Sequence, residues 1–280
     1  MANDKKDSSL MYQSFSVNGI PVLTCKRDTT IRKPLAILCH GATGKKEQFL
    51  QTGLLQRFAQ RGYYAVAMDN RLSGERKPKK SLHQKVREFG KLDFYEKLVS
   101  ADETAKDVSI LIDAISCSEE VDASRILILG VSLGGIIAIK SMQRDERISA
   151  GITLISTFDL KIHPLAPELL QKFCVRDKIN LAVTYGEAHN PIDALPALNQ
   201  RPLLLVNGGK KDKLVDIERV RASQEILKKS YTDHPERLQI RVFNNLAHRF
   251  QKQEWDQVWR EICIWLDSVP GLEQRDRTAV

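Results

Sequence analysis

The 280-residue sequence contains no apolar run long enough to span a bilayer, which requires about 20 consecutive apolar residues. Its first ten residues are polar and lack the apolar centre of a secretory signal peptide. No internal repeat, proline-rich linker or low-complexity block divides the chain. We therefore expect one soluble domain, 1–280, and the 42% apolar composition is sufficient for a substantial core.

Cysteine is scarce and irregularly spaced. The five cysteines, an odd number, show no paired spacing of the kind found in zinc sites. They are Cys25, Cys39, Cys117, Cys174 and Cys263. Most lie in apolar stretches, which favours reduced thiols in the core over a disulfide framework. The pattern predicts a cytoplasmic location and no metal site.

The formal net charge of +8 comes without aromatic residues beside the basic ones. The densest basic segment, 71–80, contains five lysines or arginines and no aromatic residue. Positive charge alone attracts nucleic acid nonspecifically and reads no bases. We interpret the segment as a solvated loop and expect no nucleic-acid partner.

Nucleotide-binding signatures are missing as well. No Gly-x-Gly-x-x-Gly pattern follows an expected strand, so no dinucleotide cofactor is predicted. The glycine-rich segment 41–46 follows a strand and opens a helix, as a phosphate loop does. However, Cys39 stands where the first glycine is needed, and Lys46 replaces the serine or threonine that would hold magnesium. We expect neither nucleotide hydrolysis nor any cofactor.

Strand and helix patterns alternate along most of the chain. Two apolar segments flank Asn18-Gly19, the dipeptide most suited to a tight antiparallel hairpin. The expected strands are 12–17, 20–27, 35–39, 63–68, 126–129, 151–155, 202–206 and 238–243. The expected helices are 47–61, 93–115, the segment after Ser132, 217–231 and 253–266. This alternation predicts an α/β fold with a mostly parallel sheet of about eight strands and helices on both faces.

The segment 157–198 interrupts the alternation. It contains four prolines and two short helical patterns, too irregular for a standard crossover between strands. We predict that it forms a small helical cap over a pocket. Its large apolar side chains are candidate substrate contacts, and packing in the core explains each of them at least as well. These candidates are Phe158, Leu160, Leu165, Leu169 and Phe173.

The pattern Gly-x-Ser-x-Gly occupies 130–134, directly after the expected strand 126–129 and before a helical pattern. A serine at such a sharp turn has a strained backbone, and its hydroxyl projects above the sheet. The flanking glycines relieve crowding, and Gly135 would let the helix lie close to the sheet. We therefore predict that Ser132 is a nucleophile.

Ser132 needs a base to remove its proton, and His248 follows the expected strand 238–243 by one short loop. The carboxyl ends of parallel strands meet at one edge of the sheet, so His248 is expected beside Ser132. His234 precedes the same strand, at the opposite end. The other histidines belong to a glycine-rich turn or to polar loops and are His40, His83, His163 and His189.

The acid that orients the base is expected after the preceding strand, 202–206. Asp212 lies in the glycine-rich turn that follows this strand and is the preferred candidate. Asp216 is the alternative, but N-capping of the helix 217–231 already explains its presence.

A tetrahedral intermediate also needs amide donors for its oxyanion. The backbone N–H of Leu133, directly after the nucleophile, is one candidate. The turn that begins with His40 and Gly41 leaves the end of the strand 35–39, so the N–H of Ala42 is the second candidate.

These motifs resemble those of α/β-hydrolases over about 20–266. The acid turn Gly-x-x-Asp-x-x-Val matches 209–215, and 69–74 is similar to the Asp-x-Arg-Gly-x-Gly loop of these enzymes, with Leu72 in place of a glycine. Within the family, the chain resembles bacterial carboxylesterases related to dienelactone hydrolases and prolyl-oligopeptidase-like serine hydrolases. Dienelactone hydrolases proper carry cysteine where Ser132 stands, which disfavours their chemistry.

The resemblance implies a serine carboxylesterase that forms an acyl-enzyme with a small-molecule ester and uses Ser132, His248 and Asp212 as its catalytic residues. One alternative is a peptidase or amidase that applies the same site to an amide. Another is a noncatalytic protein that keeps the fold and holds a ligand. A homodimer is compatible with the sequence.

Overall fold

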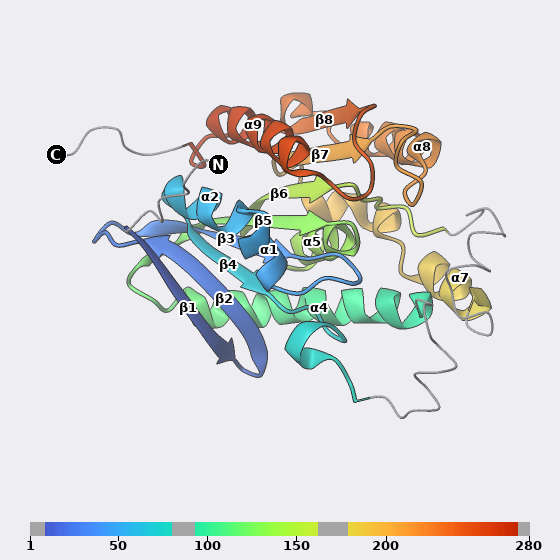
Figure 1. The fold of residues 1–280 in the computed structure, drawn as a ribbon. Helices are drawn as coiled ribbons and strands as arrows, with labels where there is room; N and C mark the ends of the chain where they lie inside the picture. Colours follow the sequence, from blue (N-terminus) through green and yellow to red (C-terminus); the bar gives the residue numbers. More distant parts are fainter. Residues whose placement is uncertain (1–8, 80–92, 162–178, 274–280) are drawn as a thin grey trace.

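Asn18 and Gly19 both take positive φ, 49° and 79°, and close the hairpin between β1 (Leu10–Val17) and β2 (Ile20–Arg27). A two-residue turn of this kind requires positive φ at both positions. In the computed structural model, which describes residues 9–79, 93–161 and 179–273, the hairpin begins an eight-stranded sheet (Figure 1). The predicted antiparallel opening is confirmed.

The sheet has the order β1-β2-β4-β3-β5-β6-β7-β8. The remaining strands are β3 (Lys33–Cys39), β4 (Tyr64–Met68), β5 (Val121–Val131), β6 (Ile148–Leu154), β7 (Leu203–Gly208) and β8 (Leu238–Phe243). β2 pairs antiparallel with β1 and β4, and every other neighbouring pair is parallel. The predicted α/β fold is confirmed, and the carboxyl ends of the parallel strands meet at one edge.

Alternate strand residues point into two separate cores, one on each face of the sheet. In β3, for example, Ile37 packs in the first core, whereas Ala36 and Leu38 pack in the second. The first core includes residues of α4 (Phe94–Ile115), α5 (Leu133–Arg144), α7 (Ile179–Ala188), η3 (Pro191–Leu198) and α8 (Ile217–Lys228). The second includes residues of α1 (Glu47–Gln51), α2 (Leu54–Gln60) and α9 (Lys252–Ser268) (Figure 1).

The continuous helix expected over 47–61 is wrong. Gly53 takes φ 76°, a left-handed conformation that a continuing α-helix cannot accommodate, and it separates α1 from α2. The apolar periodicity continues across the break because both short helices cover the same face of the sheet. Periodicity alone therefore does not reveal the break.

Of the predicted cap segment, the structure describes 157–161 and 179–198, where α7 and η3 are the two helical pieces. Tyr185 of α7 donates a hydrogen bond to Asp102 of α4 and packs edge to face against Tyr95. These contacts attach α7 to the main body. The division into one domain with a cap at 157–198 stays a prediction.

Cys25 and Cys39 are buried, as expected from their apolar surroundings, and Cys174 lies outside the described residues. Burial raises the pKa of Cys39 to about 12, which keeps this thiol protonated and unreactive. Within the described ranges, no helix is sufficiently long and apolar to cross a membrane.

Candidate active site

Ser132 occupies the sharp turn between β5 and α5. Its backbone angles, φ 55° and ψ −117°, are rarely adopted by residues other than glycine. The surrounding backbone maintains this conformation. The Ser132 N–H donates to Leu154 O at 2.8 Å, and Ser132 O accepts from the Gly135 N–H and the Ser156 hydroxyl, both at 2.8 Å. The predicted strand, strained turn and helix are all present.

Glycine is required on both sides of this turn because backbone atoms crowd together. A Cβ at Gly130 would lie 1.8 Å from Gly134 O, and a Cβ at Gly134 would lie 2.0 Å from Cys39 O. Nonbonded carbon atoms prefer separations of about 3.5–4.0 Å, so neither site tolerates a side chain without backbone movement. A Cβ at Gly135 would likewise lie 2.4 Å from the Ser156 side chain, which agrees with a close approach of α5 to the sheet.

Three side chains from three strand ends form a hydrogen-bonded row. Ser132 Oγ lies 3.0 Å from His248 Nε2, and His248 Nδ1 lies 3.2 and 3.0 Å from the two carboxylate oxygens of Asp212. Asp212 follows β7 and His248 follows β8, so both reach the edge of the sheet where Ser132 lies. The side chain of His248 is 18% exposed and that of Asp212 is 1% exposed. Such a row can transfer a proton from the hydroxyl to the imidazole.

The Asp212 carboxylate is held in its charged form. Its Oδ1 accepts hydrogen bonds from the Leu214 and Val215 N–H groups at 2.9 and 3.0 Å. Burial favours the neutral acid, but His248 and these two amides outweigh it and hold the pKa of Asp212 below its ordinary value. A charged carboxylate at Nδ1 selects the His248 tautomer with its proton on Nδ1, which leaves Nε2 free to accept from Ser132.

Asp216, the alternative acid, has a different role. Its side chain accepts the Glu218 N–H at 3.0 Å and caps the N-terminus of α8. The fold thus places Asp212 against His248 and gives Asp216 the capping contact.

The other described histidines have partners away from this row. His189 stacks on the Tyr185 ring, and the His234 ring lies 3.3 Å from Glu236 before β8. His40 is buried after β3, in the turn that precedes α1. Two further histidines considered in the sequence lie outside the described residues: His83 and His163.

The segment 40–44, here called the oxyanion loop for its predicted role, lies against Ser132. A Cβ at Gly41 would be 3.6 Å from Ser132 Cβ, an ordinary van der Waals contact. Ala42 is the next residue of the loop, and Leu133 begins α5 directly after Ser132. The backbones of both predicted donors are therefore near Ser132, and their role in binding an oxyanion stays a prediction.

The loop 69–74 keeps its turn although Leu72 replaces the expected glycine. Leu72 takes φ 60°, in the left-handed region that glycine favours. Gly74, in contrast, cannot be replaced easily, because a Cβ there would lie 2.1 Å from the Asp69 carboxylate. That carboxylate is fully buried and accepts the Glu75 N–H at 2.9 Å.

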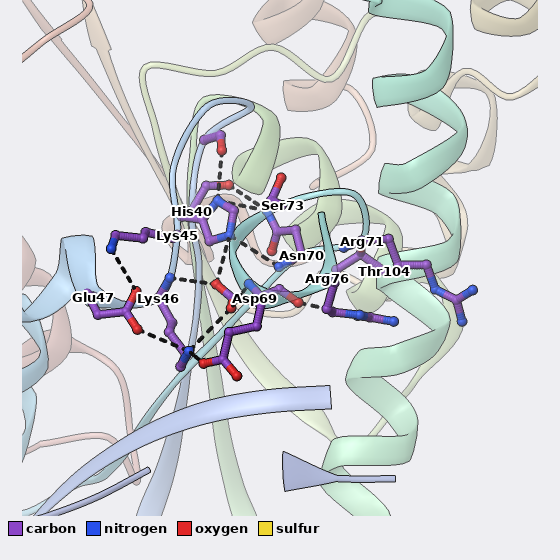
Figure 2. Close-up of polar contacts among 12 residues, drawn as sticks. His40, Lys45, Lys46, Glu47, Asp69, Asn70, Arg71, Ser73, Arg76 and Thr104 are labelled. Atoms are coloured by element: carbon purple, nitrogen blue, oxygen red, sulfur yellow. Dashed lines mark hydrogen bonds and ion pairs between the residues drawn. The ribbon is translucent and has the colours of Figure 1, made fainter. Parts of the chain in front are cut away.

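A buried ammonium group joins the loop 69–74 to the segment directly after the oxyanion loop. The Lys46 side chain is 1% exposed and forms ion pairs with Asp69 at 3.3 Å, Glu47 at 3.0 Å and Glu75 (Figure 2). An unpaired buried charge costs several kcal/mol, so these acids are needed to keep Lys46 inside. In the sequence, Lys46 stands out only as a mismatch to a phosphate loop, and nothing in the pattern predicts its burial.

Asp107 of α4 fastens the loop 69–74 from its other side. The 2% exposed side chain of Asp107 accepts two hydrogen bonds from Arg71, at 2.8 and 2.7 Å, and one from Arg76 at 2.7 Å. Burial opposes the negative charge, but the two guanidinium groups outweigh it and hold the pKa of Asp107 below its ordinary value.

We expect Asp107→Asn to lower the free energy of unfolding by about 1–3 kcal/mol at neutral pH, because both guanidinium groups lose a charged acceptor. A depressed carboxyl pKa stabilises the fold above the unfolded pKa of about 4, and this contribution is lost as pH falls through the lower folded value. The stability of the variant should therefore depend less on pH below about pH 4. Urea unfolding at a series of pH values measures both effects.

Asp113→Asn is the matched control for this prediction. Asp113, also on α4, forms an exposed ion pair with Arg147, and loss of such a pair costs at most about 1 kcal/mol. Equal losses in the two variants, or parallel pH profiles for Asp107→Asn and the wild type, would contradict the assigned role of Asp107.

Two predicted substrate contacts lie in the core. Phe158 and Leu160 are 3% and 4% exposed and belong to the core cluster on the face of α4 and α5. Packing accounts for both side chains, and direct contact with a substrate stays a prediction. The other three candidates, Leu165, Leu169 and Phe173, lie outside the described residues.

Ser156 and Asn207 support the backbone of Ser132, and no sequence motif pointed to either. Ser156 Oγ donates to Ser132 O at 2.8 Å, and Asn207 Nδ2 donates to Ser156 O at 2.8 Å. Asn207 is a buried polar residue near the carboxyl end of β7, and that placement is the one signal that could have identified it. Across the described parts of the chain, no group of three or more His, Cys, Asp or Glu residues could hold a metal ion.

Comparison with known proteins identifies a family for this chain. The family model described as serine aminopeptidase, S33 matches residues 31–190, more than half of the chain. A relative from Bacillus subtilis (strain 168), named "Putative esterase YitV", is 25% identical over 248 residues, which cover 86% of this chain and 93% of the relative.

Two solved structures illustrate the shared fold. The esterase Pf2001 from Pyrococcus furiosus is 18% identical, with a TM-score of 0.61 and coverage of 93% of each chain. The acylaminoacyl peptidase from Pyrococcus horikoshii is 16% identical, with a TM-score of 0.70, and the match covers 99% of this chain but 44% of the peptidase. At these identities the likeness establishes the fold alone.

Proposed function

Because the chain belongs to the serine aminopeptidase S33 family of α/β-hydrolases, we propose that it is a serine carboxylic ester hydrolase acting on small to medium esters. The observation that carries this proposal is the row from Ser132 Oγ through His248 to Asp212, with contacts of 3.0 Å on each side of the imidazole. The relative from Bacillus subtilis, whose printed name includes the word esterase, supports the choice of ester over other bonds.

In the first half of the reaction, Ser132 Oγ attacks the ester carbonyl carbon while His248 Nε2 takes the hydroxyl proton. The carbonyl oxygen becomes an oxyanion, which the N–H groups of Ala42 and Leu133 bind. The intermediate then collapses to an acyl-enzyme, the C–O bond to the alcohol breaks, and His248 gives its proton to the departing alkoxide. Asp212 holds the imidazole and stabilises its positive charge during both transfers.

The second half uses water in place of the serine. His248 Nε2 takes a proton from the water as its oxygen attacks the acyl carbon, and the same two amides bind the new oxyanion. Collapse breaks the bond to Ser132 Oγ, and the proton returns from His248 to this oxygen. The products are a carboxylic acid and the free enzyme, and no metal or organic cofactor takes part.

Peptide or amide hydrolysis is the second candidate. The family description names an aminopeptidase, and the fold is shared with an acylaminoacyl peptidase. A third candidate, ligand binding without catalysis, has less support, because it does not require an ionised Asp212 beside His248.

Hydrolysis profiles test these candidates on the purified wild-type protein. We expect turnover of p-nitrophenyl esters along a series from acetate to decanoate, with kcat/KM at least about tenfold above that for aminoacyl p-nitroanilides. A preference for acetate or butyrate would indicate a narrow cleft, and decanoate turnover would indicate a wide one. The reverse ratio of ester to anilide would favour the peptidase, and no turnover of either class would favour the binding protein.

Other expectations from the sequence remain proposals. The cytoplasmic location rests on the cysteine pattern, and the absence of a nucleic-acid partner rests on the lack of aromatic residues in 71–80. The sequence is also compatible with a homodimer.

A further inference from the structure

We propose that His40 is a positioning residue, whose ring sets the direction in which the oxyanion loop presents the Ala42 N–H to the substrate. This inference rests on the proposed function and adds a residue to it. The His40 ring is buried between the loop that carries Lys45 and Lys46 and the loop that carries Asp69 and Asn70 (Figure 2).

The ring acts on one peptide group. His40 Nδ1 lies 2.8 Å from Gly41 O, and the Gly44 N–H donates to the same oxygen at 3.0 Å. In a trans peptide, the carbonyl and the following N–H point in opposite directions. Two donors that hold Gly41 O on one side therefore turn the Ala42 N–H to the other side. A Cβ built on Gly41 would lie 3.6 Å from Ser132 Cβ, so the oriented N–H belongs to the residue that follows this close approach to Ser132.

The hydrogen bonds also determine which ring nitrogen carries the proton. The Asn70 N–H donates to His40 Nε2 at 3.2 Å, so Nε2 must be an acceptor. Nδ1 must then be the donor to Gly41 O, an oxygen that can only accept. The opposite tautomer would keep the longer contact, 3.4 Å, between Nδ1 and Asn70 Nδ2, and its Nε2 proton would face Asp69 Oδ1 at 3.8 Å, beyond hydrogen-bond distance.

Protonation of both nitrogens is disfavoured at this buried site. Burial lowers the pKa of His40 below its ordinary value, although the Gly41 hydrogen bond and the charge of Asp69 oppose this shift. The neutral ring with its proton on Nδ1 is therefore the form that the fold selects near neutral pH.

The partner that orients the ring is itself fixed. Asn70 Nδ2 donates to His40 O at 2.7 Å, and the adjacent Asp69 carboxylate accepts the Lys46 N–H at 2.9 Å and contacts Lys46 Nζ at 3.3 Å. All four residues are at most 1% exposed. The two loops are thus bound to each other on both sides of the ring. Loss of the ring hydrogen bond to Gly41 O would therefore change the orientation of the Gly41–Ala42 peptide.

Two substitutions separate the positioning role from a packing role. In His40→Asn, the side-chain amide can occupy the Nδ1 position and still donate to Gly41 O, but the acceptor for the Asn70 N–H is lost. In His40→Gln, the amide reaches the Nε2 position and can accept that N–H, but no donor remains for Gly41 O. Ester hydrolysis and urea unfolding are measured for both variants and for the wild type.

We expect His40→Gln to lose about 10- to 100-fold in kcat with KM within about threefold of the wild type, because the misdirected donor acts mainly in the transition state. His40→Asn should retain kcat within about fivefold, even though its urea midpoint falls as far as that of His40→Gln or further. Equal losses of kcat in the two variants, or losses that follow the urea midpoints, would overturn the proposal.

A second measurement needs no variant and stays decisive if either one fails to fold. His248 has the same expected tautomer, so the His40 signals are first assigned by triple-resonance spectra. Long-range hydrogen–nitrogen correlation spectra of imidazole-labelled wild-type protein should then show Nδ1 protonated and Nε2 unprotonated in the His40 ring. The reverse tautomer at His40 would overturn the proposal. Absence of ester turnover in the wild type would instead contradict the proposed esterase function, so the two failures are distinguishable.

Discussion

Replacement of Ser132 by alanine should reduce kcat for ester hydrolysis by about a millionfold, the loss typical for removal of a serine nucleophile. The reason is chemical. Without Oγ no acyl-enzyme forms, and a water held by His248 and the oxyanion donors supplies only the residual rate. Steady-state hydrolysis of a short p-nitrophenyl ester measures the loss. A fluorophosphonate probe should phosphonylate Ser132 Oγ with loss of fluoride in the wild type and should not label Ser132→Ala at this position.

Ser141→Ala is the matched control for this prediction. Ser141 lies in α5 and is fully buried, and its hydroxyl donates to Ile137 O of the same helix at 2.8 Å. Ser132→Ala should unfold at nearly the same urea concentration as the wild type, because the backbone bonds that hold the turn do not involve Oγ. Retention of more than about 1% of wild-type turnover would mean that Ser132 is not the nucleophile.

Asp212→Asn should reduce kcat by about ten-thousandfold, with little change in the fold. Oδ1 of the new amide can still accept the Leu214 and Val215 N–H groups. The NH2 group then takes the position of Oδ2, the carboxylate oxygen nearer His248 Nδ1. That NH2 group is a donor, so His248 Nδ1 must become an acceptor and the ring proton moves to Nε2. A protonated Nε2 cannot take the proton of the Ser132 hydroxyl.

Asp216→Asn makes the same chemical change four residues away and is the control. Asparagine caps helices about as well as aspartate, so the bond to the Glu218 N–H should persist. We expect Asp216→Asn to keep wild-type kcat and KM and to change the free energy of unfolding by at most about 0.5 kcal/mol. A large loss of kcat in Asp216→Asn with little loss in Asp212→Asn would show that Asp216 is the acid that orients His248. That result would contradict the proposed row of Ser132, His248 and Asp212.

Much of the fold follows from local chemistry in the sequence. The positive φ values at Asn18 and Gly19 correspond to a dipeptide suited to a tight turn, and Asp93 caps α4 where the expected helix begins. The break at Gly53 escaped prediction because an isolated glycine is tolerated inside many helices. Only the positive φ that Gly53 takes in the folded chain separates α1 from α2.

The proposed catalytic residues were predictable for a topological reason. Ser132, Asp212 and His248 each follow a strand, and the parallel order of β5, β7 and β8 brings those strand ends to one edge. The buried contacts of Lys46 with Asp69 were not predictable in this way. They depend on the packing of two loops against each other, and charge in a sequence pattern ordinarily indicates exposure.

The sequence by itself determined the alternation of strands and helices and the strand ends from which Ser132, Asp212 and His248 arise, because these depend on short-range patterns and chain order. Tertiary structure alone decided that Lys46 is buried beside Asp69, that Leu72 takes a conformation suited to glycine, and that the His40 ring lies between Gly41 O and the Asn70 N–H. Each of these depends on how loops far apart in the chain pack against each other at one edge of the sheet.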